Sequence, residues 1–512
     1  MGDRQIRARR APRLLRSGAG AAIKVPRWAV GVVGLALVLL SVWQIQAATQ
    51  GLEITSVRSA VPPLTLVAPA GAADGSRPLV LVSHGFAGSG VVMRGFALSL
   101  AHAGYVVALW DFDGHGANPR PLPFDMERGI LVANAEAALA EAEARGLVAP
   151  GWVAILGHSM GSGVALAFGQ THPETAATIA VSPVEQAVTP ALPRNLLLMA
   201  GGLEAPFVHN AEQRLVEAGG PGGDPAAGTA RKLLIIPGVE HVSILFSPAA
   251  HAATRDWLDA TFGPQPGATA YTDRRVLWHG LGVLGTLLAA RALAPLVAQP
   301  SPARASDRSH WRRLAALAGG ALGATLALWL AGRAGLELRS LLGLLVGGYL
   351  MMWFGVAGLV SLLLLRVRPS LPSPRAVLGG LLAFAALWLG VGLLGQLVWL
   401  RWLLIPQRLL LWPLGGLLLL PWFLAVGELA RGAGILSGLG WWLGHSALLA
   451  GGLSLTLPLN PEPGFIVIVL PLLPIVLGLH ALAAAPHRGS WPFALSGALF
   501  TSWLFLAVFP LQ

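Results

Sequence analysis

The stretch from residue 152 to 163 carries the residue whose chemistry is easiest to read, Ser159. Apolar residues lead into Gly157-His-Ser-Met-Gly161, and a run of small and apolar residues follows. This G-x-S-x-G pattern, placed between a strand and a helix, is typical of a nucleophilic serine on a sharp turn. The two glycines are needed because side chains there would collide with neighbouring backbone. The pattern predicts that Ser159 is a nucleophile; the alternative is a glycine-rich turn with a capping serine.

The segment around Ser159 alternates strand-like and helix-like patterns, which predicts how the turn is supported. Strands that alternate with helices form a mostly parallel sheet with both faces covered. The sequence therefore predicts an α/β domain over residues 51–265. Its expected strands are residues 62–70, 78–83, 105–110, 152–156, 176–181, 196–200 and 232–236, and its further helices are residues 91–103, 126–146, 207–218 and 248–262.

Residues 60–264 resemble the α/β-hydrolase superfamily, in particular its dienelactone hydrolase-like and esterase-like branches. The landmarks are Ser83-His84-Gly85-Phe86 after one expected strand, Asp111-Phe-Asp113-Gly-His115-Gly after the next, and the turn at Ser159. Asp113 stands where the superfamily usually has arginine. Glu204 and His241 follow two later strands, in the order serine, acid, histidine that the superfamily uses.

The resemblance implies a role for each member of this set. His241 is the expected base that takes the proton of Ser159, because a serine hydroxyl alone is a weak nucleophile. Glu204 is the expected acid that orients His241 and stabilises its charged form. Glu185, which follows the preceding expected strand, is the alternative acid.

Backbone N–H groups are expected to stabilise the negative charge that develops on the substrate oxygen. By position, these are the N–H groups of Phe86 and Met160, which would form the oxyanion hole. His84 is expected to bond backbone near this loop, and Asp111 and His115 to hold the turn that follows the next strand.

The connection at residues 184–194 is short at a point where many relatives insert a helical lid. A minimal lid and an open cleft are therefore expected. Selection of the substrate would then depend on loops or on the membrane beside the domain.

Composition divides the chain into two halves. The 512 residues exceed one ordinary domain, and 54% hydrophobic with 12% charged residues excludes a wholly soluble protein. The absence of cysteine excludes disulfides and thiol chemistry. The sequence shows no metal-ligand cluster and no glycine-rich nucleotide motif, so neither a metal nor another cofactor is expected.

The amino-terminal tail explains much of the net charge of +11. Residues 1–27 contain eight basic residues and one acidic residue, and residues 28–50 carry no charge. This pattern predicts a cytoplasmic tail followed by a transmembrane signal anchor. Binding of polyanions by the tail and cleavage of the apolar segment are the alternatives. Nucleic acid is not an expected partner.

Residues 276–512 predict a membrane domain, because apolar runs of about 20 residues, long enough to cross a bilayer, recur there. About eight spans are expected, at residues 276–297, 314–332, 340–365, 376–400, 409–427, 434–457, 465–482 and 491–511. Ionisable groups inside these segments are few and isolated, which favours a packed anchor over an ion or substrate path. A groove that delivers lipid to Ser159 is the alternative.

The distribution of arginine among the expected loops favours a cytoplasmic amino terminus. The α/β domain would then lie on the non-cytoplasmic side of the cell membrane. An even number of later spans would place the carboxyl terminus on that side too. We therefore expect a multi-pass membrane protein that acts on molecules in or near the outer leaflet.

Two functions are compatible with this pattern. One is a membrane-anchored serine hydrolase that cleaves carboxylic esters, lipid esters or amides through an acyl-enzyme, with membrane lipids around it. The other is a transport or assembly protein whose hydrolase-like domain binds without cleaving. The complete order of serine, acid and histidine, with an oxyanion loop, favours the hydrolase.

Overall fold

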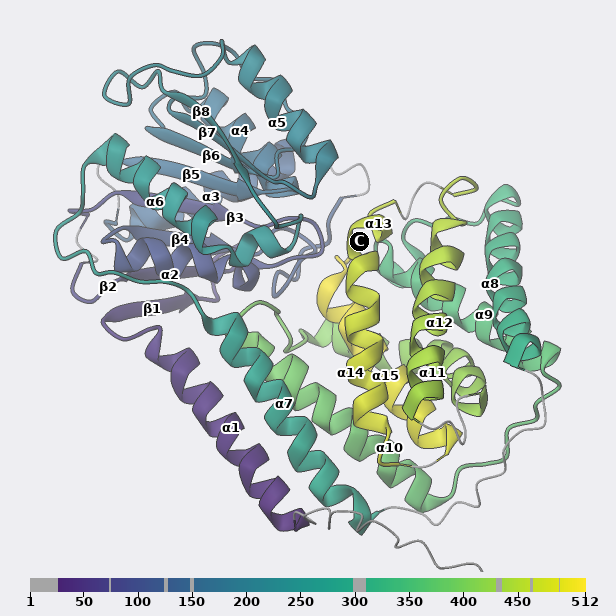
Figure 1. Cartoon of the computed structure of the whole chain (residues 1–512). Coiled ribbons are helices and arrows are strands. Elements are labelled where there is room, and N and C mark those ends of the chain that lie inside the picture. The colour runs from purple at the N-terminus through teal and green to yellow at the C-terminus, as the bar shows by residue number, and fades with distance from the viewer. Residues whose placement is uncertain are drawn as a thin grey trace, which may run out of the picture.

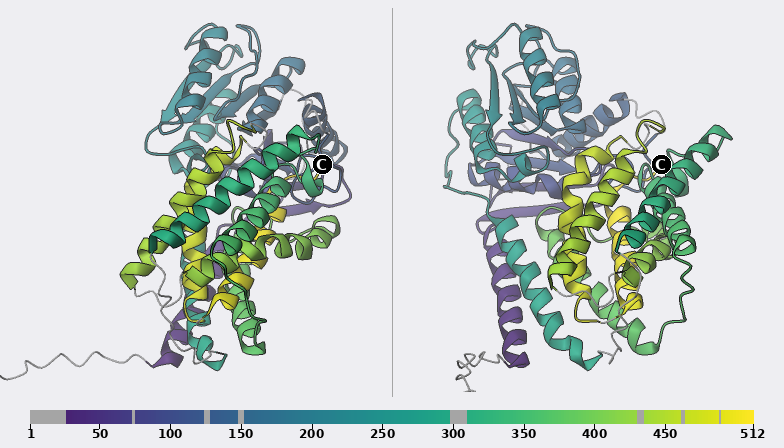
Figure 2. Two further views of the ribbon diagram at one scale, coloured as in Figure 1. Left: turned by 90° about the vertical axis from the view of Figure 1, so that its right-hand side faces the viewer. Right: turned by 45° about the vertical axis from the view of Figure 1, so that its right-hand side comes forward.

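The computed structural model describes residues 26–72, 75–123, 128–147, 152–297, 310–429, 435–460, 464–487 and 489–512. An α/β domain lies at one end of a region built of helices (Figures 1 and 2). Helix α1 (Arg27–Ala47) precedes the α/β domain and packs along α7 (Arg275–Leu293), which follows it. Residues 1–25 of the predicted basic tail lie outside the described residues.

One sheet of eight strands, in the order β1-β2-β4-β3-β5-β6-β7-β8, forms the centre of the α/β domain. β1 and β2 are antiparallel to each other, β2 is antiparallel to β4, and all other neighbours are parallel. The predicted mostly parallel sheet is confirmed. The strands are β1 (Leu52–Val57), β2 (Leu64–Pro69), β3 (Leu79–Ser83), β4 (Val106–Trp110), β5 (Val153–His158), β6 (Ala177–Val181), β7 (Leu196–Gly201) and β8 (Arg231–Ile236).

The first strand, β1, is absent from the sequence-based prediction. Most of its side chains are exposed, as expected for a strand at the edge of the sheet. An exposed edge strand lacks the apolar run by which the buried strands are recognised.

Helices cover both faces of the sheet because the strands are apolar on both faces. Along β3, Leu79 and Leu81 belong to one buried cluster, and Val80 and Val82 belong to another, since successive side chains of a strand point to opposite faces. One face is covered by α2 (Arg94–His102) and α6 (Pro248–Phe262), and the other by α3 (Arg128–Ala144), α4 (Met160–Thr171) and α5 (Ala205–Glu217).

The helical region contains α7, α8 (His310–Arg333), α9 (Gly347–Leu364), α10 (Pro374–Leu387), α11 (Pro406–Leu429), α12 (Ile435–Ser454), α13 (Ile466–Val469), α14 (Leu473–Ala484) and α15 (Ser490–Val508). Within the described parts of the chain, seven helices, α1 included, are long and apolar enough to cross a membrane. Six of them fall on the eight predicted segments.

The two other predicted segments are helical but differ from simple spans. α12 contains His445 and Ser446, which lower its mean hydropathy. The segment that starts at α13 is interrupted at Leu470–Leu472 before α14 begins, and Pro471 and Pro474 stand at this interruption. Proline removes a backbone donor and clashes with the preceding turn, which explains the break.

The carboxyl edge of the parallel strands faces the helical region, and backbone hydrogen bonds join the two. The N–H of Leu511 donates to the Gly114 carbonyl (2.8 Å), and the N–H of Leu122 donates to the Leu511 carbonyl (2.8 Å). The buried guanidinium of Arg408, in α11, donates to the same Gly114 carbonyl (2.5 Å) and to that of Phe509 (2.7 Å). The turn after β4 is therefore held directly on the helices.

Candidate active site

Ser159 lies on a strained turn between β5 and α4. Its backbone has φ 54° and ψ −121°, a conformation that a residue other than glycine rarely adopts. A Cβ atom at Gly157 would lie 1.9 Å from the Gly161 carbonyl oxygen, and one at Gly161 would lie 2.6 Å from the His84 carbonyl oxygen. The predicted need for glycine at both positions is confirmed.

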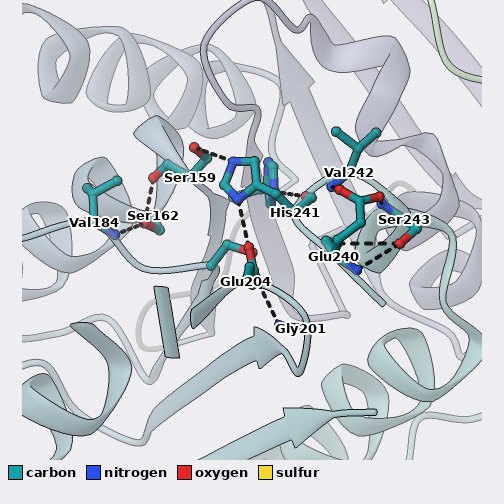
Figure 3. A network of polar contacts seen from close by, with 11 residues as sticks. Ser159, Ser162, Val184, Gly201, Glu204, Glu240, His241, Val242 and Ser243 are labelled. Carbon is teal, nitrogen blue, oxygen red and sulfur yellow. Dashed lines mark hydrogen bonds and ion pairs between the residues drawn. The ribbon is translucent and has the colours of Figure 1, made fainter. Parts of the chain in front are cut away.

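His241 joins Ser159 to Glu204 (Figure 3). Its Nε2 lies 2.9 Å from the Ser159 hydroxyl oxygen, and its Nδ1 lies 2.7 Å from Oε2 of Glu204. Each of the three residues is 6% exposed. With its Nδ1–H donated to the carboxylate, the imidazole presents an acceptor at Nε2 to the serine hydroxyl. The structure thus brings together the three residues that the sequence singled out.

The Glu204 carboxylate is fixed by donors on both oxygens. Oε1 accepts from the Ser182 hydroxyl (2.7 Å) and from the N–H of Gly201 (2.5 Å), while Oε2 faces His241. Glu185, the alternative acid, is exposed in the loop after β6. The carboxylate at Nδ1 of the histidine is therefore Glu204.

The loop that carries His241 is held by its neighbours (Figure 3). The Glu240 carboxylate accepts from the N–H groups of Val242 and Ser243, both at 2.8 Å. His158 lies 2.9 Å, through Nε2, from the His241 carbonyl, and the Phe207 ring stacks on the His241 ring with centroids 4.2 Å apart. These contacts restrict the imidazole to the orientation that reaches Ser159.

Sequence reasoning did not identify Ser182, Phe207 or Glu240 as parts of the site. Ser182 directly follows β6, and its φ of 49° marks a turn, but neither feature is visible in the sequence pattern. Phe207 belongs to α5, and only the packing of this helix brings the ring to His241. Of the three, Glu240 alone could have been identified from its place in the sequence. It is adjacent to His241, and acidic side chains often accept hydrogen bonds from the backbone two or three residues later.

The expected oxyanion loop runs beside Ser159. A Cβ atom at Gly85 would lie 3.0 Å from Cβ of Ser159, so the backbone leading to Phe86 passes directly next to the serine. Met160 is the first residue of α4, and an N–H at this position has no carbonyl partner within its helix. The assignment of the Phe86 and Met160 N–H groups as oxyanion donors stays a prediction.

His84 supports this loop from inside the domain. Its Nδ1 lies 2.8 Å from the Gly85 carbonyl, and its Nε2 accepts from the N–H of Phe112 (3.2 Å). This pattern requires the neutral ring, and burial lowers the pKa of His84. His84 therefore bonds backbone groups on both sides of its ring, as predicted.

The turn after β4 is held by side chains, as predicted. Asp111 accepts from the N–H groups of Gly90 and Ala117, both at 2.7 Å. His115 bonds the Asp113 carbonyl through Nδ1 (2.9 Å). Asp113, which replaces the usual arginine, accepts from an Asn118 amide (2.9 Å), and burial raises its pKa.

The minimal lid expected after β6 is confirmed, because residues 184–194 form no helix. Ser159 is 6% exposed. The open cleft stays a prediction. The Phe465 ring, from the helical region, contacts the Phe86 ring with centroids 4.6 Å apart. This contact places the helical region next to the loop that runs beside Ser159, although the two segments are distant in sequence.

The chemistry available at this site is proton transfer and nucleophilic attack. Across the parts of the chain that the structure describes, no group of three or more His, Asp or Glu side chains is placed to hold a metal ion. A serine hydroxyl bonded to an oriented imidazole can attack an acyl carbon as its proton passes to the ring.

Comparison with known proteins agrees with this fold. Residues 74–217 match the family described as serine aminopeptidase, S33. Two sequences from strains of Mycobacterium tuberculosis, both described as uncharacterized proteins, are 30% identical over an alignment of 192 residues, and the match covers 33% of this chain. The match covers 64% of the length of these relatives. With the strand order described above, the resemblance of residues 60–264 to the α/β-hydrolase superfamily is confirmed.

Solved structures are similar over less than half of the chain. The dienelactone hydrolase from Anabaena variabilis is 22% identical, with 40% of this chain and 95% of that chain covered and a TM-score of 0.31. The HSL homologue EstE7 from a metagenome library is 17% identical, with 46% of this chain and 98% of that chain covered and a TM-score of 0.31.

Four buried histidines of the α/β domain predict how stability depends on pH. Burial lowers the pKa of His84, His115, His158 and His251 below the usual 6.5. The unfolded chain then binds more protons than the folded chain as the pH falls below about 6.5. The free energy of unfolding should be highest above this pH and fall below it, by roughly 1.4 kcal/mol per pH unit for each fully titrating histidine.

The measurement is the thermal midpoint of detergent-purified protein between about pH 8 and pH 5. His158→Gln, whose amide can replace the hydrogen bond to the His241 carbonyl, should make the thermal midpoint decrease less at low pH. His209→Gln, on the exposed surface of α5, should leave it unchanged. A midpoint that does not fall in the wild type at low pH would contradict the prediction.

Proposed function

We propose that this protein is a membrane-embedded serine hydrolase that cleaves carboxylic esters through an acyl-enzyme. The observation that carries the proposal is the position of His241, within hydrogen-bond distance of both Ser159 and Glu204. The match of residues 74–217 to a family of serine hydrolases supports it.

The proposed reaction has two halves. Ser159 Oγ attacks the acyl carbon while its proton passes to Nε2 of His241, and Glu204 stabilises the imidazolium that forms. The tetrahedral oxyanion would be bound by the N–H groups of Phe86 and Met160, each contributing about 3–4 kcal/mol. His241 then returns the proton to the departing alcohol. Water repeats the sequence on the acyl-enzyme and releases the acid.

Lipid esters are the substrate class that the surroundings favour. The loop that carries Phe86 runs beside Ser159, and the Phe465 ring of the helical region contacts the Phe86 ring. An acyl chain that enters beside this loop would meet the apolar rings of Phe86 and Phe465. Amides are a second class to assay, because the matching family is described as serine aminopeptidase.

A binding-only domain would not need the hydrogen bonds that hold Glu204 and His241. A glycine-rich turn with a capping serine would not need them either. Two backbone strains, at Ser159 and Ser182, also lie within this network. Strain of this kind is costly and concentrates at reactive sites. The hydrolase is therefore the better supported of the two functions.

For the membrane, we propose the orientation with a cytoplasmic amino terminus. Two arginines, Arg401 in the segment before α11 and Arg408 in the first turn of α11, count against this orientation, but both contact the α/β domain. Arg401 lies 3.8 Å from Asp111, and Arg408 donates to the Gly114 carbonyl, so these cations serve contacts with the α/β domain. Leu511 pairs with Gly114, which agrees with a carboxyl terminus on the same side as that domain.

The proposed reaction predicts first that Ser159 is covalently reactive. A fluorophosphonate probe should label the purified protein, and Ser159→Ala should abolish labelling because it removes the attacking oxygen. Ser162→Ala, three residues further on, should fold less stably but keep its label. Equal labelling of wild type and Ser159→Ala would exclude Ser159 as the nucleophile.

The second prediction concerns the acid. Glu204→Gln should lower kcat for a short-chain nitrophenyl ester by about 10⁴-fold, because the amide no longer selects the imidazole tautomer. Glu185→Gln is the matched control and should act like wild type, since Glu185 is exposed. An inactive Glu185→Gln beside an active Glu204→Gln would reverse the assignment.

The third prediction tests the orientation. Alkaline phosphatase fused after residue 265 or after Gln512 should be active, because it folds only outside the cytoplasm. A fluorescent reporter that matures in the cytoplasm should be dark at both positions. A bright reporter after residue 265 would place the α/β domain inside the cell.

A further inference from the structure

A small cavity lies at the junction of the α/β domain and the helical region. Its volume is about 50 Å³, several times the minimum for one water molecule. Three arginines line it: Arg58 after β1, Arg94 at the start of α2, and Arg401 from the segment before α11. Asp111 is the one acidic side chain in its lining.

The Asp111 carboxylate already accepts hydrogen bonds from the backbone. Both oxygens of Asp111 accept backbone N–H groups at 2.7 Å, and the nearest guanidinium nitrogen of Arg401 is 3.8 Å away. This separation is too long for a direct hydrogen bond. Asp111 therefore leaves most of the positive charge of the cavity uncompensated.

The arginines have few other partners. Within the described part of the chain, the Arg94 side chain donates to the Gln396 carbonyl alone, at a long 3.4 Å, and the buried Nε of Arg401 has no partner there. Burial, and next the charges of Arg275 and Arg401, lower the pKa of Arg94 to about 10. Partly buried cations at such close range are costly unless an anion joins them.

We infer that this cavity binds a phosphate group, carried by a lipid headgroup or free in solution. Guanidinium groups present parallel N–H donors that match phosphate oxygens, and Arg58, Arg94 and Arg401 converge from three separate segments. The site is separate from the Ser159 centre and does not depend on hydrolysis there.

A lipid source fits the place of the cavity. α1 ends at Ala47 and α7 begins at Arg275, both where the helical region meets the sheet at β1 (Figure 1). The headgroup phosphates of a bilayer lie at the ends of its spanning helices. A phosphate held by Arg94 and Arg401 would therefore lie at the depth of the adjoining lipid headgroups.

The test uses detergent-purified full-length protein and two phosphate probes, dihexanoylphosphatidic acid and inorganic phosphate, with dihexanoylglycerol as the phosphate-free control. Calorimetric titration should show saturable binding of phosphatidic acid and none of dihexanoylglycerol. Arg94→Gln and Arg401→Gln should each weaken binding about 10-fold or more, because each removes charge-assisted hydrogen bonds. Arg145→Gln, exposed in the turn directly after α3, should bind like wild type.

The two phosphate probes separate the two sources. Inorganic phosphate that binds as tightly as the lipid identifies free phosphate as a sufficient ligand, and much tighter binding of the lipid identifies the headgroup. Arg58→Gln, exposed at the edge of the cavity, keeps the test decisive if Arg94→Gln does not fold. Wild-type affinity in the folded arginine variants, or no saturable binding of either probe, would overturn the inference.

Discussion

The buried guanidinium of Arg408 holds the two parts of the chain together. It is 1% exposed and donates to the carbonyls of Gly114, Leu506 and Phe509, the first in the α/β domain and the others at the end of the helical region. Burial of a charge is costly unless hydrogen bonds compensate for it. These three carbonyls supply the compensation, whereas Nε of Arg408 has no partner among the described residues. Because Leu511 pairs with the same turn, the carboxyl edge of the sheet cannot leave the helices without exposing this charge.

This junction decides what surrounds the proposed nucleophile. α/β domains place reactive loops at the carboxyl ends of their strands, and here the segments after β3 and β4 lie against helices. The Phe465 ring, from the helical region, packs edge to face on the Phe86 ring. Exclusion of water by this aromatic contact would strengthen the electrostatic interactions among Ser159, His241 and Glu204.

The site itself stores strain that the sheet must offset. Ser159 and Ser182 both have positive φ, and both lie directly after central parallel strands. Each buried apolar side chain in those strands contributes roughly 1.5–3 kcal/mol, against about 1–3 kcal/mol for each strained residue. The core of the α/β domain can therefore hold the hydroxyl of Ser159 in one place, which proton transfer to His241 requires.

The sequence alone determined the features that arise from neighbours in the chain. The strand, turn and helix around Ser159 follow from local spacing, the alternating elements from periodicity, and the apolar helices from composition, so all of these were predictable. Tertiary structure decided three features: the choice of Glu204 over Glu185, the stacking of Phe207 on His241, and the packing of Phe465 on Phe86. Each feature depends on how segments that are distant in sequence pack against one another. No local sequence pattern specifies this packing.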